Sequence, residues 1–403
     1  MKLLDLNGYR DILDKCSHCS FCQSTCPVYT ESLLETYVAR SRAELIKSVF
    51  LDKTLPVTDR VKEIVDRCLL CTNCQQTCPA SIPIPELVIN ARYQIYQGKR
   101  LDFPKRLVLK QLMKKRGLKG IWSLAGKIGK KLGMTPEELP DFPPKTFERL
   151  YPPKKYTVKG KPRARVAYYV GCGTNSMYPD TGAAVMKVLK HNGIEVILPK
   201  ETVCCGLPAL GEGDVNLAKA MMVKNIQILS SLDVDTIVTD CTSCGLTLKS
   251  KMLSVLDPDD SIYLKAQAVA DKIYEVSDYL NKIGLSQKPE PKNWKYSYHV
   301  PCHRGWSPGL VEAPLELLDA ADLKEYRALD DPQKCCGAGG SFFTEYKTVA
   351  QNIRAPKLED VNNNEAKTVI TQCPLCRMYL SHGLPDGTTV IHPIQLLAQA
   401  YDI

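Results

Sequence analysis

Hydrophobic side chains recur at mostly helical spacing over residues 1–95. Two amphipathic runs, residues 33–50 and 60–66, have this spacing, and the proline-containing stretch 79–85 separates periodic runs. Apolar positions three and four residues apart form one face of an α-helix. The pattern therefore predicts an α-helical N-terminal domain over residues 1–95.

From residue 165 the pattern changes to short apolar runs that alternate with longer helical ones. This alternation predicts a mainly parallel sheet with helices packed against it. It occurs twice, once over residues 163–284 and again over residues 285–403. The expected strands are residues 165–170, 195–198, 236–239, 296–300 and 368–371, and the expected helices are residues 181–192, 216–229 and 345–361.

Between these parts, residues 96–162 are basic at first and then rich in proline, which indicates a linker or arm. Residues 99–131 hold twelve lysines and arginines against one acid, Asp102, in a chain of net charge +9. This basic segment either binds an anionic membrane surface or an acidic partner, or packs as a helical arm across the two domains. We expect no nucleic-acid binding, because bound metal clusters would bring the whole protein near neutral or acidic.

The 403 residues contain no apolar stretch near the ~20 residues that cross a bilayer. Acidic residues stand near the N-terminus, where a signal peptide would have an apolar core. We therefore expect a cytoplasmic protein, with peripheral binding to the inner face of the membrane as an option. Its 18 cysteines are the unusual feature, since thiols in a reducing compartment usually bind metal.

Eight of the cysteines form two runs with the spacing C-x₂-C-x₂-C-x₃-C-P, which end at Pro27 and Pro79. In the two-cluster bacterial ferredoxins that share this spacing, the fourth cysteine of each run binds the other cluster. We therefore expect two cubane [4Fe–4S] clusters. Two Cys₄ zinc sites are the alternative, although zinc needs no third cysteine at this spacing. The expected ligands are Cys16, Cys19, Cys22 and Cys78 for one cluster, and Cys68, Cys71, Cys74 and Cys26 for the other.

The other ten cysteines form two groups of five. Corresponding members of the two groups are 130 to 132 residues apart, which indicates a duplicated domain. The first cysteine of each group, and the first of each C-x₂-C pair, follows an expected strand, where parallel sheets bind ligands. The groups are Cys172, Cys204, Cys205, Cys241 and Cys244, and Cys302, Cys335, Cys336, Cys373 and Cys376.

Five thiolates are one more than a tetrahedral zinc uses. The side chains of neighbouring cysteines diverge, so each vicinal pair is suited to two different iron atoms of one extended cluster. A glycine follows each pair, Gly206 and Gly337, and permits a positive φ and a close approach of the backbone to a bulky inorganic core. A redox dithiol at Cys241 and Cys244, or zinc held by four of the five thiolates, is the alternative.

Four segments resemble the cysteine-rich CCG domain family: Val203-Cys-Cys-Gly-Leu-Pro, Asp240-Cys-Thr-Ser-Cys-Gly, Tyr298-His-Val-Pro-Cys-His and Cys335-Cys-Gly-Ala-Gly-Gly. That family includes the catalytic subunit of heterodisulfide reductase and the iron–sulfur subunits of anaerobic glycerol-3-phosphate dehydrogenase, glycolate oxidase and L-lactate oxidation systems. The resemblance covers nearly the whole chain. It implies an α-helical ferredoxin-type N-terminal domain and an α/β duplicated CCG domain with pseudo-two-fold repeats.

The resemblance also implies one or two noncubane [4Fe–4S] clusters, each held by one group of five cysteines, with zinc in one group as an alternative. It implies an oxidoreductase. In the first interpretation the chain is an electron-transfer subunit between a flavin-containing dehydrogenase partner and a quinone or other carrier. In the second it cleaves a disulfide at a noncubane cluster. His303, beside Cys302, either donates a hydrogen bond to a cluster sulfur or only packs against its loop.

Overall fold

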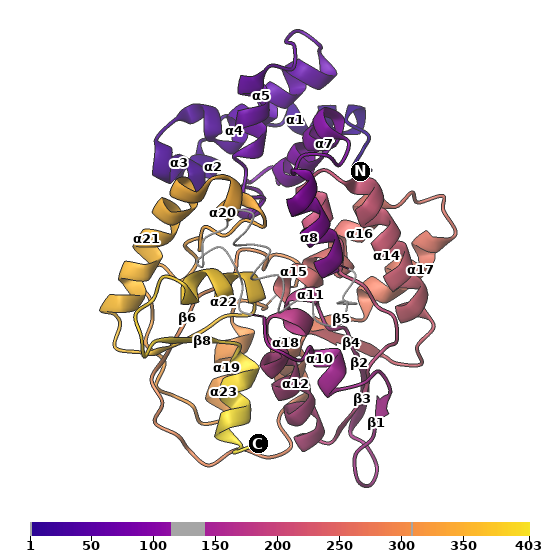
Figure 1. Ribbon diagram of the computed structural model, residues 1–403, viewed down its shortest axis with the longest axis vertical. Helices are drawn as coiled ribbons and strands as arrows, with labels where there is room; N and C mark the ends of the chain where they lie inside the picture. The colour runs from indigo at the N-terminus through magenta and orange to yellow at the C-terminus, as the bar shows by residue number, and fades with distance from the viewer. Residues whose placement is uncertain (1, 114–141, 308) are drawn as a thin grey trace.

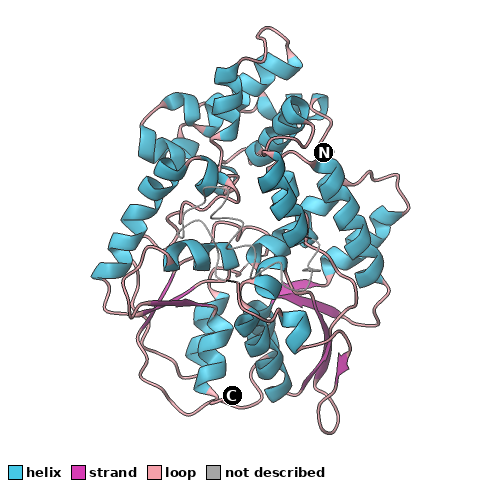
Figure 2. Ribbon diagram, viewed as in Figure 1, coloured by secondary structure: helices cyan, strands magenta, loops and turns pink. Residues whose placement is uncertain are grey.

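The computed structural model describes residues 2–113, 142–307 and 309–403 of the chain. A helical N-terminal part lies above two α/β repeats that stand side by side, each with its own sheet (Figure 1). The strands are confined to the lower part of the molecule, while helices cover the sheets and make up the upper part (Figure 2). This arrangement agrees with the predicted order of a helical domain followed by two α/β units.

The N-terminal part is built around the buried helix α7, whose residues Leu87 and Val88 are fully enclosed. The predicted run 33–50 is not one helix. Leu33 ends the preceding helix with φ 55°, and a regular helix begins only at Ala39 before passing into a π-helical turn, Lys47–Leu51. The helices of this part are α1 (Arg10–Leu13), α2 (Phe21–Ser24), α3 (Pro27–Ser32), α4 (Ala39–Ile46), α5 (Asp59–Asp66), α6 (Asn73–Gln76) and α7 (Ile84–Tyr96).

The first repeat has a five-stranded sheet in the order β1-β3-β2-β4-β5. All neighbours pair in parallel except β1 and β3, which are antiparallel. Its strands are β1 (Lys155–Tyr156), β2 (Ala164–Tyr168), β3 (Ile194–Ile197), β4 (Thr236–Thr239) and β5 (Ile273–Glu275). Its helices are α11 (Cys172–Ser176), α12 (Pro179–His191), α13 (Leu207–Gly211), α14 (Val215–Ser230), α15 (Thr242–Leu246), α16 (Met252–Val255), α17 (Ile262–Asp271) and α18 (Val276–Ile283).

The second repeat has a three-stranded parallel sheet in the order β6-β7-β8. These strands correspond to β2, β4 and β5, and a single parallel bridge between Tyr296 and Tyr326 stands where β3 would pair. The strands are β6 (Tyr296–Tyr298), β7 (Thr368–Ile370) and β8 (Thr389–Ile391). The helices are α19 (Ala313–Ala320), α20 (Phe342–Glu345), α21 (Lys347–Asn363), α22 (Pro374–Ser381) and α23 (Pro393–Ala400).

The two repeats share one hydrophobic core. Helices α12 and α18 of the first repeat lie between the sheets with α19 and α23 of the second (Figure 1). Val185 and Leu280 are buried in the same cluster as Leu317 and Leu397. Because apolar surface from both repeats is buried together, each repeat stabilises the other.

Every strand that the sequence predicts is present, with its end shifted by at most two residues. The three strands that were not predicted, β1, β5 and β8, have only two or three residues each, which is too short for a periodic pattern to stand out. The predicted placement of cysteines is also confirmed, because Cys172, Cys241, Cys302 and Cys373 follow β2, β4, β6 and β7.

The described parts of residues 96–162 pack against the first repeat. Helix α8 (Phe103–Met113) ends at its core, where the Cys204 backbone N–H donates to the Met113 carbonyl at 2.9 Å. Strand β1 joins the sheet, and the short helix α10 (Phe147–Leu150) buries Phe147 against α12. Residues 114–131 of the basic segment lie outside the described residues.

Candidate metal centres and the junction between them

The two ferredoxin-type runs fold into the same kind of loop. Ser20 and Thr72, which are 52 residues apart, both adopt a left-handed conformation, with φ 67° and 65°, and each begins a one-turn helix. Thr25 and Thr77, also 52 residues apart, face each other with their Oγ1 atoms 3.3 Å from one another. The repeated spacing therefore corresponds to a repeated structure.

The fourth cysteine of each run lies with the other run. Cys22 lies near Cys16 and Cys78, and burial raises the pKa of its thiol. A cavity is lined by Cys16, Cys19, Cys22 and Cys78, together with Cys74 of the second run. In the second group, burial raises the pKa of Cys74 well above its usual value, and the charges of Cys68 and Cys26 act in the same direction. Cys78 of the second run thus lies with thiols of the first run, and Cys26 of the first run lies near Cys74 of the second.

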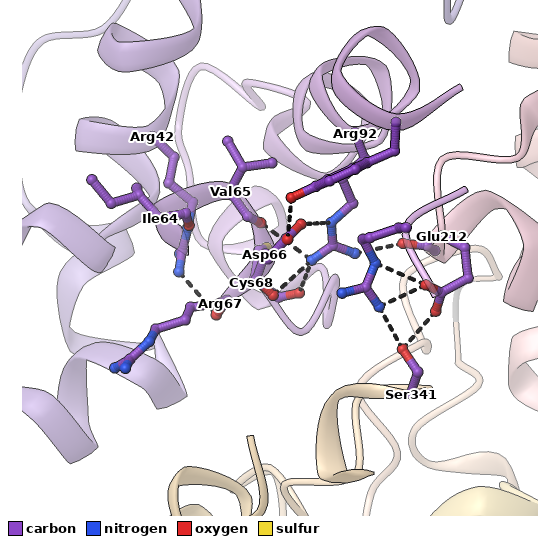
Figure 3. A network of polar contacts seen from close by, with 12 residues as sticks. Arg42, Ile64, Val65, Asp66, Arg67, Cys68, Arg92, Glu212 and Ser341 are labelled. Atoms are coloured by element: carbon purple, nitrogen blue, oxygen red, sulfur yellow. Dashed lines mark hydrogen bonds and ion pairs between the residues drawn. The ribbon is translucent and has the colours of Figure 1, made fainter. Parts of the chain in front are cut away.

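Two buried arginines hold the backbone that leads into the second run (Figure 3). The Arg92 guanidinium donates at 2.7 Å to the Cys68 carbonyl and at 2.6 Å to the Gly211 carbonyl of the first repeat. Arg42 donates from Nε to the Ile64 carbonyl at 2.9 Å. Buried cations beside a cluster of four thiolates reduce its net negative charge, which is one determinant of its potential.

A third arginine, Arg100, joins the arm to both repeats. Arg100 pairs with Glu212 of the first repeat, with Nη2 and Oε2 2.6 Å apart, and donates to the Ser341 hydroxyl of the second repeat at 2.7 Å. Ser341 in turn donates to Glu212 Oε1 at 2.5 Å. The positive charge of Arg100 is therefore neutralised by an acidic residue of the same chain.

The five thiols of the first repeat form one continuous group. The Cys172 and Cys204 sulfurs are 3.5 Å apart, the Cys204 and Cys205 thiols interact with each other, and Cys205 also interacts with Cys244, which contacts Cys241. Each of the neighbouring cysteines 204 and 205 therefore has a further thiol partner of its own. All but Cys172 are buried.

The second repeat arranges its five thiols in the same continuous group, because Cys335 and Cys336 also interact with each other. Cys302 interacts with Cys335, whereas the Cys336 sulfur is 3.3 Å from that of Cys376. Hydrogen bonds from the Cys376 thiol and from backbone N–H groups lower the pKa of Cys373 to about 7, although burial opposes this shift. Matching pairs in both repeats show that the duplication extends to the arrangement of thiols.

The glycines after the vicinal pairs have the expected backbone conformation and also pack against helix backbone, which the sequence did not predict. Gly206 and Gly337 do have positive φ, 101° and 85°. However, the close neighbour of each is helix backbone: an added Cβ would lie 3.2 Å from the Ala218 carbonyl oxygen in the first repeat and 2.5 Å from that of Ala350 in the second. The glycines therefore allow the cysteine loop to pack on α14 and α21.

The second ferredoxin-type run contacts the second repeat at Cys302, which is the first cysteine of that repeat. The Cys302 carbonyl accepts hydrogen bonds from Thr72 Oγ1 at 3.2 Å and from Gln76 Nε2 at 3.0 Å. The Cys71 thiol lies near those of Cys302 and Cys335, whose charges act on it. Thiols of the N-terminal part and of the second repeat are therefore neighbours.

His303 connects this contact to the first repeat. Its Nε2 lies 3.1 Å from the Leu70 carbonyl oxygen, and its Nδ1 lies 2.8 Å from the hydroxyl of Ser243, which stands between Cys241 and Cys244. A carbonyl can only accept, so Nε2 carries the proton, and Nδ1 of the neutral ring accepts from Ser243. Burial lowers the pKa of His303 and favours this neutral form. We define Leu70, Thr72, Gln76, Ser243 and His303 as the junction.

Sequence reasoning identified the cysteines and His303 but not the residues that hold them. Arg92 and Arg42 are charged residues on helices, and Ser243 and Gln76 are common polar residues, so nothing in a linear pattern singles them out. One signal was available for Ser243, which lies inside a C-x₂-C pair.

Comparisons with known proteins follow this division of the chain. The family model described as "4Fe-4S dicluster domain" matches residues 12–82, and the model described as "Cysteine-rich domain" matches residues 166–249 and 296–381. The second match occurs once in each repeat. The chain therefore contains one dicluster domain and two copies of the cysteine-rich CCG domain. We therefore refer to its N-terminal part as the dicluster domain and to its repeats as the first and second CCG repeats.

Several relatives align over nearly the whole chain. The probable glycolate oxidase iron-sulfur subunit of Bacillus subtilis is 26% identical over 98% of this chain and 96% of its own length. The glycolate oxidase iron-sulfur subunit of Escherichia coli is 28% identical over 97% and 95%. A subunit of the fumarate reductase (CoM/CoB) of Methanothermobacter marburgensis is 26% identical over 96% of this chain and 72% of its own length.

These comparisons confirm the predicted family, the duplicated CCG domain and an oxidoreductase class in which the chain is a subunit. They support iron–sulfur clusters as the cofactors. Within the described residues, no helix is both long and apolar enough to cross a membrane.

Proposed function

We propose that the chain is the iron–sulfur electron-transfer subunit of a multi-subunit oxidoreductase, between a flavin-containing dehydrogenase partner and a quinone or other carrier. The relatives named as glycolate oxidase iron-sulfur subunits support this assignment. The proposal includes the domain boundaries 1–95, 96–162, 163–284 and 285–403, and a pseudo-two-fold relation between the two CCG repeats.

The donor sets fit the implied clusters. In the dicluster domain, Cys16, Cys19, Cys22 and Cys78 would hold one cubane cluster, and Cys68, Cys71, Cys74 and Cys26 the other. The five thiols of each CCG repeat would hold a noncubane cluster, because they form one continuous group whose two ends, the first cysteine and the C-x₂-C pair, suit different iron atoms of one centre. Such clusters supply one-electron redox chemistry when bound. The chain orients the thiols, buries half of them and places the groups next to one another.

The junction is the observation on which the proposal depends. Hydrogen bonds from Thr72 and Gln76 hold the dicluster domain on the Cys302 carbonyl, and His303 connects the same place to Ser243 of the first repeat. A chain that only needed metal for folding would have no need to bring three thiol groups together. Fixed contact between redox groups is what electron transfer requires.

Burial favours this function over disulfide cleavage. In the second repeat Cys335, Cys336, Cys373 and Cys376 are all buried, and only Cys302 is half-buried among the five. A substrate disulfide needs access to the metal, whereas electron transfer proceeds through closed packing. The relative from the CoM/CoB fumarate reductase nevertheless keeps heterodisulfide reductase-like chemistry as the second candidate.

Iron content and the crossed ligands test the assignment of the clusters. Anaerobically purified protein should hold on the order of 16 iron atoms in four clusters. Cys26→Ser should change the electron paramagnetic resonance (EPR) signal of the cluster held by Cys68, Cys71 and Cys74, and the control Cys78→Ser should change the other. A fully active preparation with little iron and stoichiometric zinc would contradict the proposal.

Electron acceptance distinguishes the two functions. A reduced flavoprotein partner, isolated with the chain from its native source, should reduce the chain's clusters in stopped-flow absorbance measurements. The same chain, given an artificial donor, should not reduce a disulfide substrate. Disulfide turnover without a flavoprotein would replace our proposal with the reductase function.

The basic segment would bind an acidic partner or an anionic membrane surface from the cytoplasmic side. Within its described part Arg100 and Arg106 face Glu212 and Asp214 of the chain itself. The remaining cations of residues 114–131 would make the external contact. Binding to vesicles that contain anionic lipid, compared with neutral vesicles, tests the membrane option.

A further inference from the structure

His299 is a buried histidine at the carboxyl end of β6, three residues before Cys302. Its side chain is 1% exposed, and its backbone N–H donates to the Ile370 carbonyl at 3.0 Å, which fixes it beside β7. Neither ring nitrogen has a hydrogen-bond partner among the described residues. A neutral imidazole offers one donor and one acceptor, so both are unsatisfied here.

Two unsatisfied nitrogens in a buried ring are costly. Leaving a buried polar group without a partner costs about 1 to 3 kcal/mol, and native structures rarely accept this. A neutral imidazole has one unprotonated nitrogen, and this is the form in which histidine binds metals.

The nearest ligand-type groups belong to the second CCG repeat. The ring nitrogen of His299 and the sulfurs of Cys336 and Cys376 all lie within 4.8 Å of one another, and the two sulfurs are 3.3 Å apart. Ligands of one tetrahedral ion lie about 3.5 to 3.8 Å apart, given metal–sulfur bonds of about 2.3 Å and metal–nitrogen bonds of about 2.0 Å. The three atoms are thus close to the spacing of a shared metal.

We propose that His299 provides a nitrogen ligand to the metal that Cys336 and Cys376 bind. A bound metal would satisfy one ring nitrogen, which the protein itself does not. The second CCG repeat would then have a mixed sulfur and nitrogen donor set. The inference rests on the proposed metal centre in this repeat and adds a ligand that the cysteine motif does not contain.

The first repeat provides an internal comparison. Tyr169 stands three residues before Cys172, at the position that corresponds to His299. Its hydroxyl donates to the Val203 carbonyl at 2.6 Å and lies 3.4 Å from Asn225 Nδ2. The protein therefore satisfies Tyr169 completely, and a phenol hydrogen-bonded in this way is not needed as a ligand. The nitrogen ligand distinguishes the second repeat from the first.

Isotope labelling of histidine tests the bond directly. Pulsed electron paramagnetic resonance on the anaerobically reconstituted full chain, with natural and with isotope-labelled histidine, detects a histidine nitrogen bound to a paramagnetic cluster. We expect a strongly coupled histidine nitrogen in the wild-type chain and its loss in His299→Gln. His303→Gln is the matched control: this histidine lies beside the same site, but both its nitrogens are engaged by Leu70 and Ser243. The coupling should persist in that variant.

The labelling result in the wild-type chain is decisive even if His299→Gln does not fold. A cluster signal from the second repeat without histidine coupling would overturn the inference and leave the proposed electron-transfer function intact. A coupling that persists in His299→Gln would also overturn it.

A mononuclear metal gives a separate outcome. If the second repeat binds one ion and no cluster, the chain can be loaded with Co²⁺, whose visible absorption distinguishes three thiolates and one nitrogen from four thiolates. The mixed set, lost in His299→Gln, would support the inference and contradict the proposed cluster in that repeat. Four thiolates in the wild-type chain would overturn the inference.

Discussion

The two CCG repeats have the same thiol arrangement but different surroundings. In both, the first cysteine pairs with the first of the vicinal cysteines, and the second vicinal cysteine pairs with the C-x₂-C segment. Three residues before the first cysteine, the first repeat has Tyr169, whose hydroxyl is hydrogen-bonded. The second repeat has His299 there, and neither of its ring nitrogens has a partner among the described residues. The two repeats therefore share the same cysteine ligands, but the residue beside these ligands differs between them.

The repeats also differ in what covers them. The cysteine loop of the second repeat contacts the dicluster domain, through Thr72 and Gln76 on the Cys302 carbonyl. The vicinal cysteines of the first repeat are instead covered by the arm, where Cys204 donates to the Met113 carbonyl. Both repeats touch the dicluster domain, the first through the bond from Arg92 to the Gly211 carbonyl. The thiols nearest to Cys71 of the dicluster domain are those of the second repeat, Cys302 and Cys335, and the Cys373 thiol of that repeat lies near Cys241 of the first. This difference predicts unequal effects of equivalent substitutions.

The largest effect is expected when equivalent ligands are removed from the two repeats. Cys336→Ser and Cys205→Ser should each lower iron content by about four atoms per chain. Only Cys336→Ser should also slow reduction of the other repeat, by more than about tenfold, because the thiols of the second repeat lie between Cys71 of the dicluster domain and Cys241 of the first repeat. Iron analysis and freeze-quench electron paramagnetic resonance measure both quantities. Equal effects of the two variants would contradict the order of the groups.

Breaking the contact that joins the repeats to the arm should have the second largest effect, a loss in the free energy of unfolding. Glu212→Gln removes the charge partner of the buried Arg100 and weakens the bond from Ser341. Breaking a buried ion pair on one side costs about 3 to 5 kcal/mol, because the remaining charge is left uncompensated. Denaturant unfolding of the anaerobic protein measures the loss. Lys62→Gln is the control, since its exposed pair with Asp59 contributes about 0 to 1 kcal/mol. Comparable losses in both variants would show that Arg100 finds another partner.

Replacing the glycine after the vicinal cysteines by alanine should destabilise the protein to different extents in the two repeats. Alanine at either position meets a positive φ, which costs about 1 to 2 kcal/mol. Gly337→Ala adds a clash, because its Cβ would lie 2.5 Å from the Ala350 carbonyl oxygen, whereas the Cβ of Gly206→Ala would lie 3.2 Å from that of Ala218. We expect Gly337→Ala to cost about 2 to 4 kcal/mol in total and Gly206→Ala about 1 to 2 kcal/mol. Thermal unfolding midpoints rank the two, and the reverse order would refute the packing explanation.

The sequence was sufficient for features that depend on spacing. The cysteine groups, their register of 130 to 132 residues and the strands that precede them follow from local pattern, because a loop at the carboxyl end of a strand is set by its own residues. The crossing of Cys26 and Cys78 was also predictable, since the proline after each of them belongs to a recurrent motif.

Features that depend on tertiary contacts were not predictable in this way. Arg92 sits on a helix of ordinary appearance, and only the fold brings its guanidinium to the Cys68 and Gly211 carbonyls. The glycines were expected to approach a metal, whereas the structure places helix backbone beside them. His299 lies inside one of the four segments that resemble the CCG family, but its lack of a partner becomes apparent only when its burial is known.

The smallest effect is expected at the position where the repeats differ most clearly. Tyr169→Phe removes one hydroxyl, which donates to the Val203 carbonyl at 2.6 Å. That carbonyl keeps the Asn225 amide as a donor at 3.3 Å, so no acceptor is left without a partner. The free energy of unfolding should therefore fall by only about 1 kcal/mol, the usual contribution of one hydrogen bond. Iron content and the spectrum of the first repeat should not change, whereas His299→Gln at the matching position should change the spectrum of the second. If Tyr169→Phe altered the first repeat's spectrum as strongly as His299→Gln alters that of the second, the two positions would have equivalent roles, and the asymmetry between the repeats would have to lie in their covering contacts alone.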